Sequence, residues 1–106
     1  MRVPLDESLR LEFAAEVLGH DVATVRSLGW DGLKNGALMQ RMASACDVFV
    51  TMDRNIPHQQ NIGALKFGVI LLQAHSNGIE ALHVVVGTVQ RAIRGARPGA
   101  LQHVGA

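Results

Sequence analysis

The sequence lacks most of the features that mark secreted and membrane-spanning proteins. It has a single cysteine, Cys46, so the chain cannot form an internal disulfide, and this fits a reducing compartment. No apolar run approaches the ~18–20 residues that span a bilayer. The charged, proline-bearing start at residues 1–4 is unlike a signal peptide. We therefore expect a cytoplasmic protein with no membrane partner.

Charge of either sign is also scarce. Charged residues make up 18% of the chain, and 10 Lys+Arg stand against 9 Asp+Glu, so a polyanion would have to be bound by a local patch. Hydrophobic residues, in contrast, make up 48%, which excludes disorder as the default state. A chain of 106 residues is long enough for one modest core. We expect a single domain over residues 1–106.

Short apolar runs alternate along the chain with longer segments of helical period. The runs predict strands at residues 3–5, 20–25, 47–51 and 68–72, with a further short strand at 98–104. The segments between them carry apolar residues at helical spacing, most clearly over residues 78–94. This alternation predicts a three-layer α/β/α domain with a mainly parallel sheet, and we expect the strand order 2-1-3-4.

Acidic residues follow two of the predicted strands. Asp6 and Glu7 follow the first strand, and Asp53 follows the third. In the order 2-1-3-4, Asp6 and Asp53 leave neighbouring strands, ~4.8 Å apart, at the point where open α/β sheets bind ligands. Two such carboxylates could share one cation, and Mg²⁺ prefers oxygen ligands of this kind. An interpretation as helix caps is equally open for Asp6, Ser8, Asp53 and Asn55.

Motifs along almost the whole chain resemble those of a PIN-like domain family of unknown function, related to PIN ribonucleases. They are Leu5-Asp6-Glu7, Gly19-His20-Asp21-Val22, the segments at residues 29–36 and 47–55, Gln59-Gln60-Asn61, Ser76-Asn77 and Arg97-Pro98-Gly99. The resemblance implies a PIN-like α/β/α fold and a Mg²⁺- or Mn²⁺-dependent endoribonuclease. It also implies a toxin of a toxin–antitoxin pair, with RNA as substrate and an antitoxin protein as partner. A homo-oligomer stays open.

The same resemblance implies Asp6 and Asp53 as the catalytic metal ligands, since they match the family's first-strand aspartate and its Thr-x-Asp aspartate. PIN nucleases usually gather three or four acids, and many relatives place one or two at the start of the second helix. Here Lys34-Asn35-Gly36 stands at that place. We therefore expect weak metal binding, with Glu7, Asp31, Asn35 and Asn55 as supporting residues.

The polar residues Gln59, Gln60 and Asn61 are expected on the helix after Asp53, where they could contact phosphates or base edges of RNA. A solvated helix face explains them equally simply. Trp30, in a glycine-rich loop, could stack on a nucleobase or cover the edge of the core.

Two other functions fit parts of the sequence. One is a catalytically weak or inactive PIN-like module that only binds RNA or a protein. The other is a receiver-like phospho-acceptor domain, because Asp6-Glu7, Asp53 and Ser76 mimic the acidic pair, the acceptor aspartate and the hydroxyl residue of receivers. Receivers also need a lysine after their fifth strand, and the last lysine here is Lys66.

Overall fold

The computed structural model describes residues 1–9, 12–17, 19–33, 35–73 and 79–105. Its strands are β1 (Arg2–Leu5), β2 (Asp21–Thr24), β3 (Val48–Thr51), β4 (Gly68–Gln73) and β5 (Leu101–Gly105). Its helices are α1 (Glu12–Glu16), α2 (Asn35–Met42), α3 (Ile56–Gln59) and α4 (Ile79–Arg94), with a 3₁₀ turn, η1 (Ile62–Ala64), before β4.

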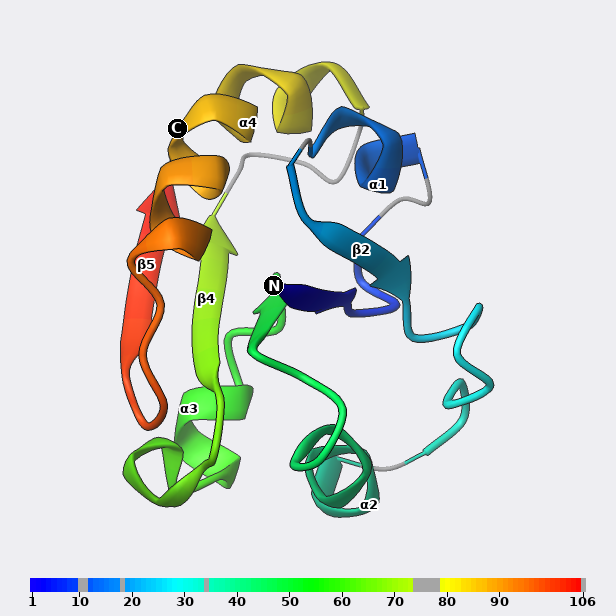
Figure 1. Ribbon diagram of the computed structural model, residues 1–106, viewed down its shortest axis with the longest axis vertical. Helices are drawn as coiled ribbons and strands as arrows, with labels where there is room; N and C mark the ends of the chain where they lie inside the picture. The colour runs from blue at the N-terminus through cyan, green and yellow to red at the C-terminus, as the bar shows by residue number, and fades with distance from the viewer. Residues whose placement is uncertain (10–11, 18, 34, 74–78, 106) are drawn as a thin grey trace.

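The strands form one parallel sheet in the order β2-β1-β3-β4-β5 (Figure 1). Leu5 at the end of β1 lies opposite Thr24 of β2 on one side and Val50 of β3 on the other. This confirms the predicted α/β class and the order 2-1-3-4, and the further strand near the chain end extends the sheet as β5. The carboxyl ends of β1, β2 and β3 therefore meet at one edge of the sheet.

Helices cover both faces of this sheet and bury a core against each face, which gives the three layers. Figure 1 shows α1 and α4 on one side of the sheet and α2 and α3 on the other. The alternation of side chains along β3 divides the two cores, because Val48 and Val50 pack toward α1 and α4 while Phe49 packs toward α2 and α3. Full burial of each such side chain contributes roughly 1.5–3 kcal/mol.

The apolar residues after β1 recur at helical spacing, at Leu9, Phe13 and Val17. The structure describes helix α1 over Glu12–Glu16, and Gly19 follows with a φ of 86°. Leu9 and Val17 lie just outside this helix but are buried in the same core as Phe13. In the part of the chain that the structure describes, no helix is both long and apolar enough to cross a membrane.

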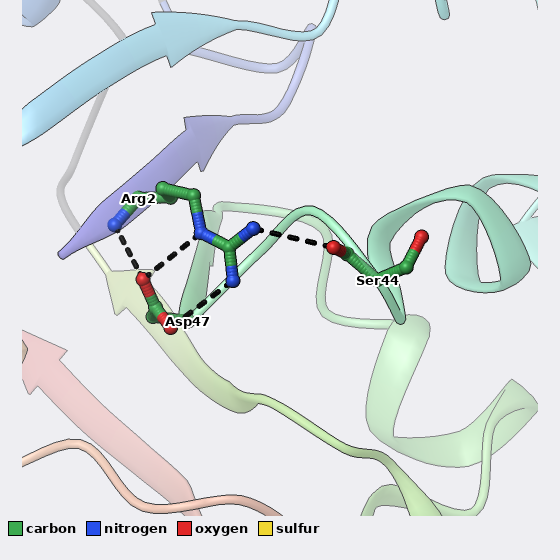
Figure 2. A network of polar contacts seen from close by, with 3 residues as sticks. All are labelled: Arg2, Ser44 and Asp47. Atoms are coloured by element: carbon green, nitrogen blue, oxygen red, sulfur yellow. Dashed lines mark hydrogen bonds and ion pairs between the residues drawn. The ribbon is translucent and has the colours of Figure 1, made fainter.

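A polar network ties the start of β1 to the segment between α2 and β3 (Figure 2). The Asp47 carboxylate accepts hydrogen bonds from the backbone N–H of Arg2 at 2.6 Å and from its guanidinium at 3.3 and 3.5 Å. The guanidinium also donates to the carbonyl of Ser44 at 3.2 Å. The network lies at the amino edge of the sheet, opposite the ends that carry Asp6 and Asp53.

This network predicts a small, acid-sensitive contribution to stability. Hydrogen bonds from the backbone and side chain of Arg2 hold the pKa of Asp47 below its usual value. The contribution is therefore complete above the unfolded pKa of about 3.9 and is lost as the pH falls through the lower folded pKa. Because both side chains are about half exposed, Asp47→Asn should cost less than about 1 kcal/mol at pH 7. The melting temperatures of the wild type and Asp47→Asn should converge as the pH falls through the lowered folded pKa of Asp47. A difference in melting temperature that does not change with pH would contradict this assignment.

Candidate functional site at the carboxyl edge of the sheet

Two hydroxyl groups fix the carboxylate of Asp6, which leaves the end of the central strand β1. The backbone N–H of Asp6 donates to the carbonyl of Val50 at 2.9 Å, so β1 and β3 stay paired up to this residue. Its Oδ2 atom accepts hydrogen bonds from the hydroxyls of Thr51 at 2.7 Å and Ser8 at 3.0 Å. The Ser8 hydroxyl in turn accepts the backbone N–H of Met52 at 3.1 Å. The end of β3 and the loop after β1 thus orient the Asp6 carboxylate together.

Asp53 is connected to Asp6 through the same threonine. The Thr51 hydroxyl, on a fully buried residue, accepts the backbone N–H of Asp53 at 3.0 Å while it donates to Asp6. Oδ1 of Asp53 accepts the backbone N–H of Asn55 at 2.9 Å, so Asp53 also holds the turn into α3, although the N-cap residue of that helix is Asn55. Within the described residues, Oδ1 of Asp6 and Oδ2 of Asp53 accept no hydrogen bond.

The supporting candidates take different places around this pair. Oε1 of Glu7 accepts the backbone N–H of Gly32 at 3.1 Å, at a backbone φ of 83° that favours glycine, so Glu7 holds the loop after β2. Asp31 is exposed in that loop. Asn55 precedes α3 without a side-chain capping bond. Asn35 begins α2, but its side chain lies outside the described part of the structure.

The described residues supply few metal ligands around Asp6 and Asp53. Among the described residues, no group of three or more His, Cys, Asp or Glu side chains could hold a metal ion. A site built on Asp6 and Asp53 would therefore depend on water, amide or phosphate oxygens for its other ligands.

The polar segment after Asp53 is less helical than expected. Helix α3 ends at Gln59, and Gln60 is extended, with φ −123° and ψ 144°, while its N–H closes the helix on the carbonyl of Ile56. Asn61 then precedes η1. Gln59 and Asn61 are exposed and Gln60 is half-buried, so the three residues share one segment but not one helix face.

A hollow of about 230 Å³ opens between the ends of β1 and β2. Its described lining consists of Asp6, Glu7, Leu9, Thr24 and Arg26. Asp53 is not part of this lining; it leaves β3, on the other side of Asp6.

Three of the residues around Asp6 were missed by sequence reasoning as parts of the site. Thr51 and Ser8 orient the carboxylate, and Arg26 brings a cation into the hollow. A hydroxyl residue at the end of a wholly apolar strand was a usable signal for Thr51. The signal for Arg26 was its place just after the second predicted strand, at the edge where Asp6 was expected.

Trp30 and Cys46 both belong to the core between the sheet and helices α2 and α3. Trp30 is half-buried and packs against the core under α2 and α3, which fits the edge of the core. Cys46 is buried in that core, and burial, together with the nearby Asp47 charge, raises the pKa of its thiol to about 12. A thiol of this kind is a poor nucleophile. Ser76, which the receiver interpretation needs, lies outside the described residues.

Comparison with known proteins adds no relative to this picture, since no family model, no curated protein and no solved structure matches the chain. The chain is a small α/β domain with a five-stranded parallel sheet and a polar site at the carboxyl ends of its central strands.

Proposed function

We propose that this chain is a PIN-like, metal-dependent endoribonuclease in which Asp6 and Asp53 hold one Mg²⁺ or Mn²⁺ ion. The observation that carries the proposal is the connection between the two aspartates. They leave neighbouring strands, and both bond to the Thr51 hydroxyl, Asp6 through its carboxylate and Asp53 through its backbone N–H. Each also has one carboxylate oxygen that accepts no hydrogen bond within the described residues. The motif resemblance supports the same pair.

The donor set fits a weakly held magnesium or manganese ion. Mg²⁺ is commonly bound through one or two carboxylates, several waters and the phosphates of its substrate, so two aspartates suffice when the substrate contributes oxygens. When bound, such an ion neutralises charge on a phosphodiester and makes water more acidic. Glu7 and Asn55 support the site indirectly here, since Glu7 holds the loop after β2 and the Asn55 N–H fixes Asp53.

The proposed partners follow from the same chemistry and from the motifs. RNA would be the substrate, with Gln59, Gln60 and Asn61 as contacts in the segment that follows Asp53, and Asp31 and Asn35 as further polar groups near the site. The motif resemblance also supports a toxin role with an antitoxin protein. A homo-oligomer is a separate proposal, and a measurement of the molecular mass in solution tests it.

The proposal is tested by incubating the purified chain with a labelled single-stranded RNA. We expect cleavage in millimolar Mg²⁺ or Mn²⁺, because a site with two carboxylates should bind the ion weakly, and no cleavage in EDTA. Cleavage at the same rate in EDTA as in Mg²⁺ or Mn²⁺ would show that the activity needs no metal ion, and would contradict the proposed metal site. RNA binding without cleavage under any metal condition would favour the inactive binding module, which the small number of acids also supports.

The receiver-like function has less support. Lys66 is exposed and precedes β4, so it lies toward the amino edge of the sheet, away from Asp53. A receiver needs a lysine beside the acceptor aspartate, and Lys66 does not lie there.

A further inference from the structure

We infer that Arg26 binds the phosphodiester of the nucleic acid on which the Asp6 site acts. The inference deepens the proposed function and rests on it for the identity of the ligand. It starts from the hollow between the ends of β1 and β2, in which Arg26 lies with two carboxylates, those of Asp6 and Glu7.

The backbone around Arg26 is held against the end of β1. The N–H of Val25, a buried residue, donates to the carbonyl of Leu5 at 2.9 Å, so the chain still follows β1 one residue after β2 ends. On the other side of Arg26, the N–H of Ser27 donates to the Thr24 hydroxyl at 3.0 Å, and the Ser27 hydroxyl donates to the Thr24 carbonyl at 2.9 Å. Arg26 is therefore presented from an ordered turn.

The positively charged Arg26 side chain is not paired with either of the two carboxylates that line the hollow with it. Within the described residues, the side chain of Arg26 makes no hydrogen bond and no ion pair, although Asp6 and Glu7 line the same space. Both carboxylates are already bound elsewhere, Asp6 to two hydroxyls and Glu7 to the Gly32 N–H. A ligand that satisfies both signs must carry an anion toward the guanidinium and a cation toward Asp6, the residue that the hollow shares with the proposed metal site.

A phosphodiester together with a divalent cation has this pair of charges. Arginine is suited to the anionic half, because its planar guanidinium can donate two parallel hydrogen bonds to phosphate oxygens. At about 230 Å³, the hollow is smaller than the ~300–1,000 Å³ of pockets that enclose whole drug-sized ligands. It therefore matches one phosphate group and its ion, with the bases outside, which favours a nucleic-acid backbone over a free nucleotide.

The test compares Arg26→Gln with Arg41→Gln, a control that removes the same charge from an exposed arginine in the last turn of α2. Binding of a labelled single-stranded oligoribonucleotide is measured by fluorescence anisotropy over a range of monovalent salt concentrations, with Ca²⁺ at a fixed concentration as the divalent cation. A gel of each sample shows whether the RNA is intact, so the assay does not depend on turnover. Arg26→Gln should weaken binding about tenfold. It should also reduce the slope of log K against log salt by about one unit, the change expected for the loss of one phosphate contact. Arg41→Gln should do neither, and Arg26→Lys should restore the salt dependence but only part of the affinity.

The outcomes separate this inference from the proposed nuclease. If the wild type cleaves RNA and both glutamine variants bind and cleave equally well, the inference is wrong and the nuclease stands. If Arg26→Gln alone loses affinity but the wild type never cleaves, phosphate recognition by Arg26 is supported and the nuclease is not. If the wild type does not bind the oligoribonucleotide, the inference is overturned. A circular dichroism melt of Arg26→Gln that matches the wild type confirms that a loss reports on binding.

Discussion

Asp6→Asn is expected to lower the rate of RNA cleavage by at least about 100-fold, because even groups that only orient a metal ligand are commonly worth 10- to 100-fold. The substitution removes one negative charge from the proposed site. An asparagine can still accept the hydroxyls of Ser8 and Thr51 through its Oδ1 atom, so the local fold should persist. Asp53→Asn should act similarly, since its amide oxygen can still accept the Asn55 N–H.

The matched control is Asp21→Asn, which removes the same charge from an exposed residue at the start of β2, at the amino edge of the sheet. Cleavage is followed under conditions where the wild type is limited by RNA concentration, and thermal melts are recorded for each variant. We expect Asp21→Asn to keep the wild-type rate. Undiminished cleavage by both Asp6→Asn and Asp53→Asn would show that the activity arises elsewhere.

Thr51→Val is expected to lower the free energy of unfolding by about 1–3 kcal/mol, because it leaves a buried polar group without its partner. Valine has nearly the shape of threonine, but it cannot accept the Asp53 N–H or donate to Oδ2 of Asp6. The loss should appear as a melting temperature lower by about 4 °C or more. Because Asp6 loses one of its two orienting hydroxyls, the rate of cleavage should fall as well.

Thr51→Ser is the companion variant, since it keeps the hydroxyl and removes only a methyl group. We expect it to keep most of the activity of the wild type while losing some stability through the small cavity. If Thr51→Val and Thr51→Ser lose activity equally, the hydroxyl does not orient Asp6 in a way that matters for cleavage.

The fold could be predicted because its signals are local. The apolar, β-branched run at residues 48–51 indicates a buried strand on its own, and the regular alternation with helical segments indicates parallel neighbours. The positions of Leu9 and Val17 just outside α1 could not be predicted in this way. Leu9 and Val17 satisfy the helical period, yet they are buried by packing beyond the helix ends.

The candidate site was less predictable because its parts depend on contacts between distant residues. Strand order placed Asp6 beside the end of β3, but the shared Thr51 hydroxyl joins residues 45 positions apart. Glu7 has the residue type of a metal ligand, yet its carboxylate holds Gly32 in the loop after β2. No sequence pattern distinguishes these two uses of a carboxylate.

The central claim is that Asp6 and Asp53 serve one metal ion, and cleavage by the double variant Asp6→Asn/Asp53→Asn tests it most directly. If both residues hold the same ion, either single substitution already removes most of its effect, so the double variant should be little slower than the slower single variant. Its residual rate should also be the same in Mn²⁺ and in EDTA. Rate losses that multiply, giving a double variant slower by the product of the two single effects, would contradict a shared ion.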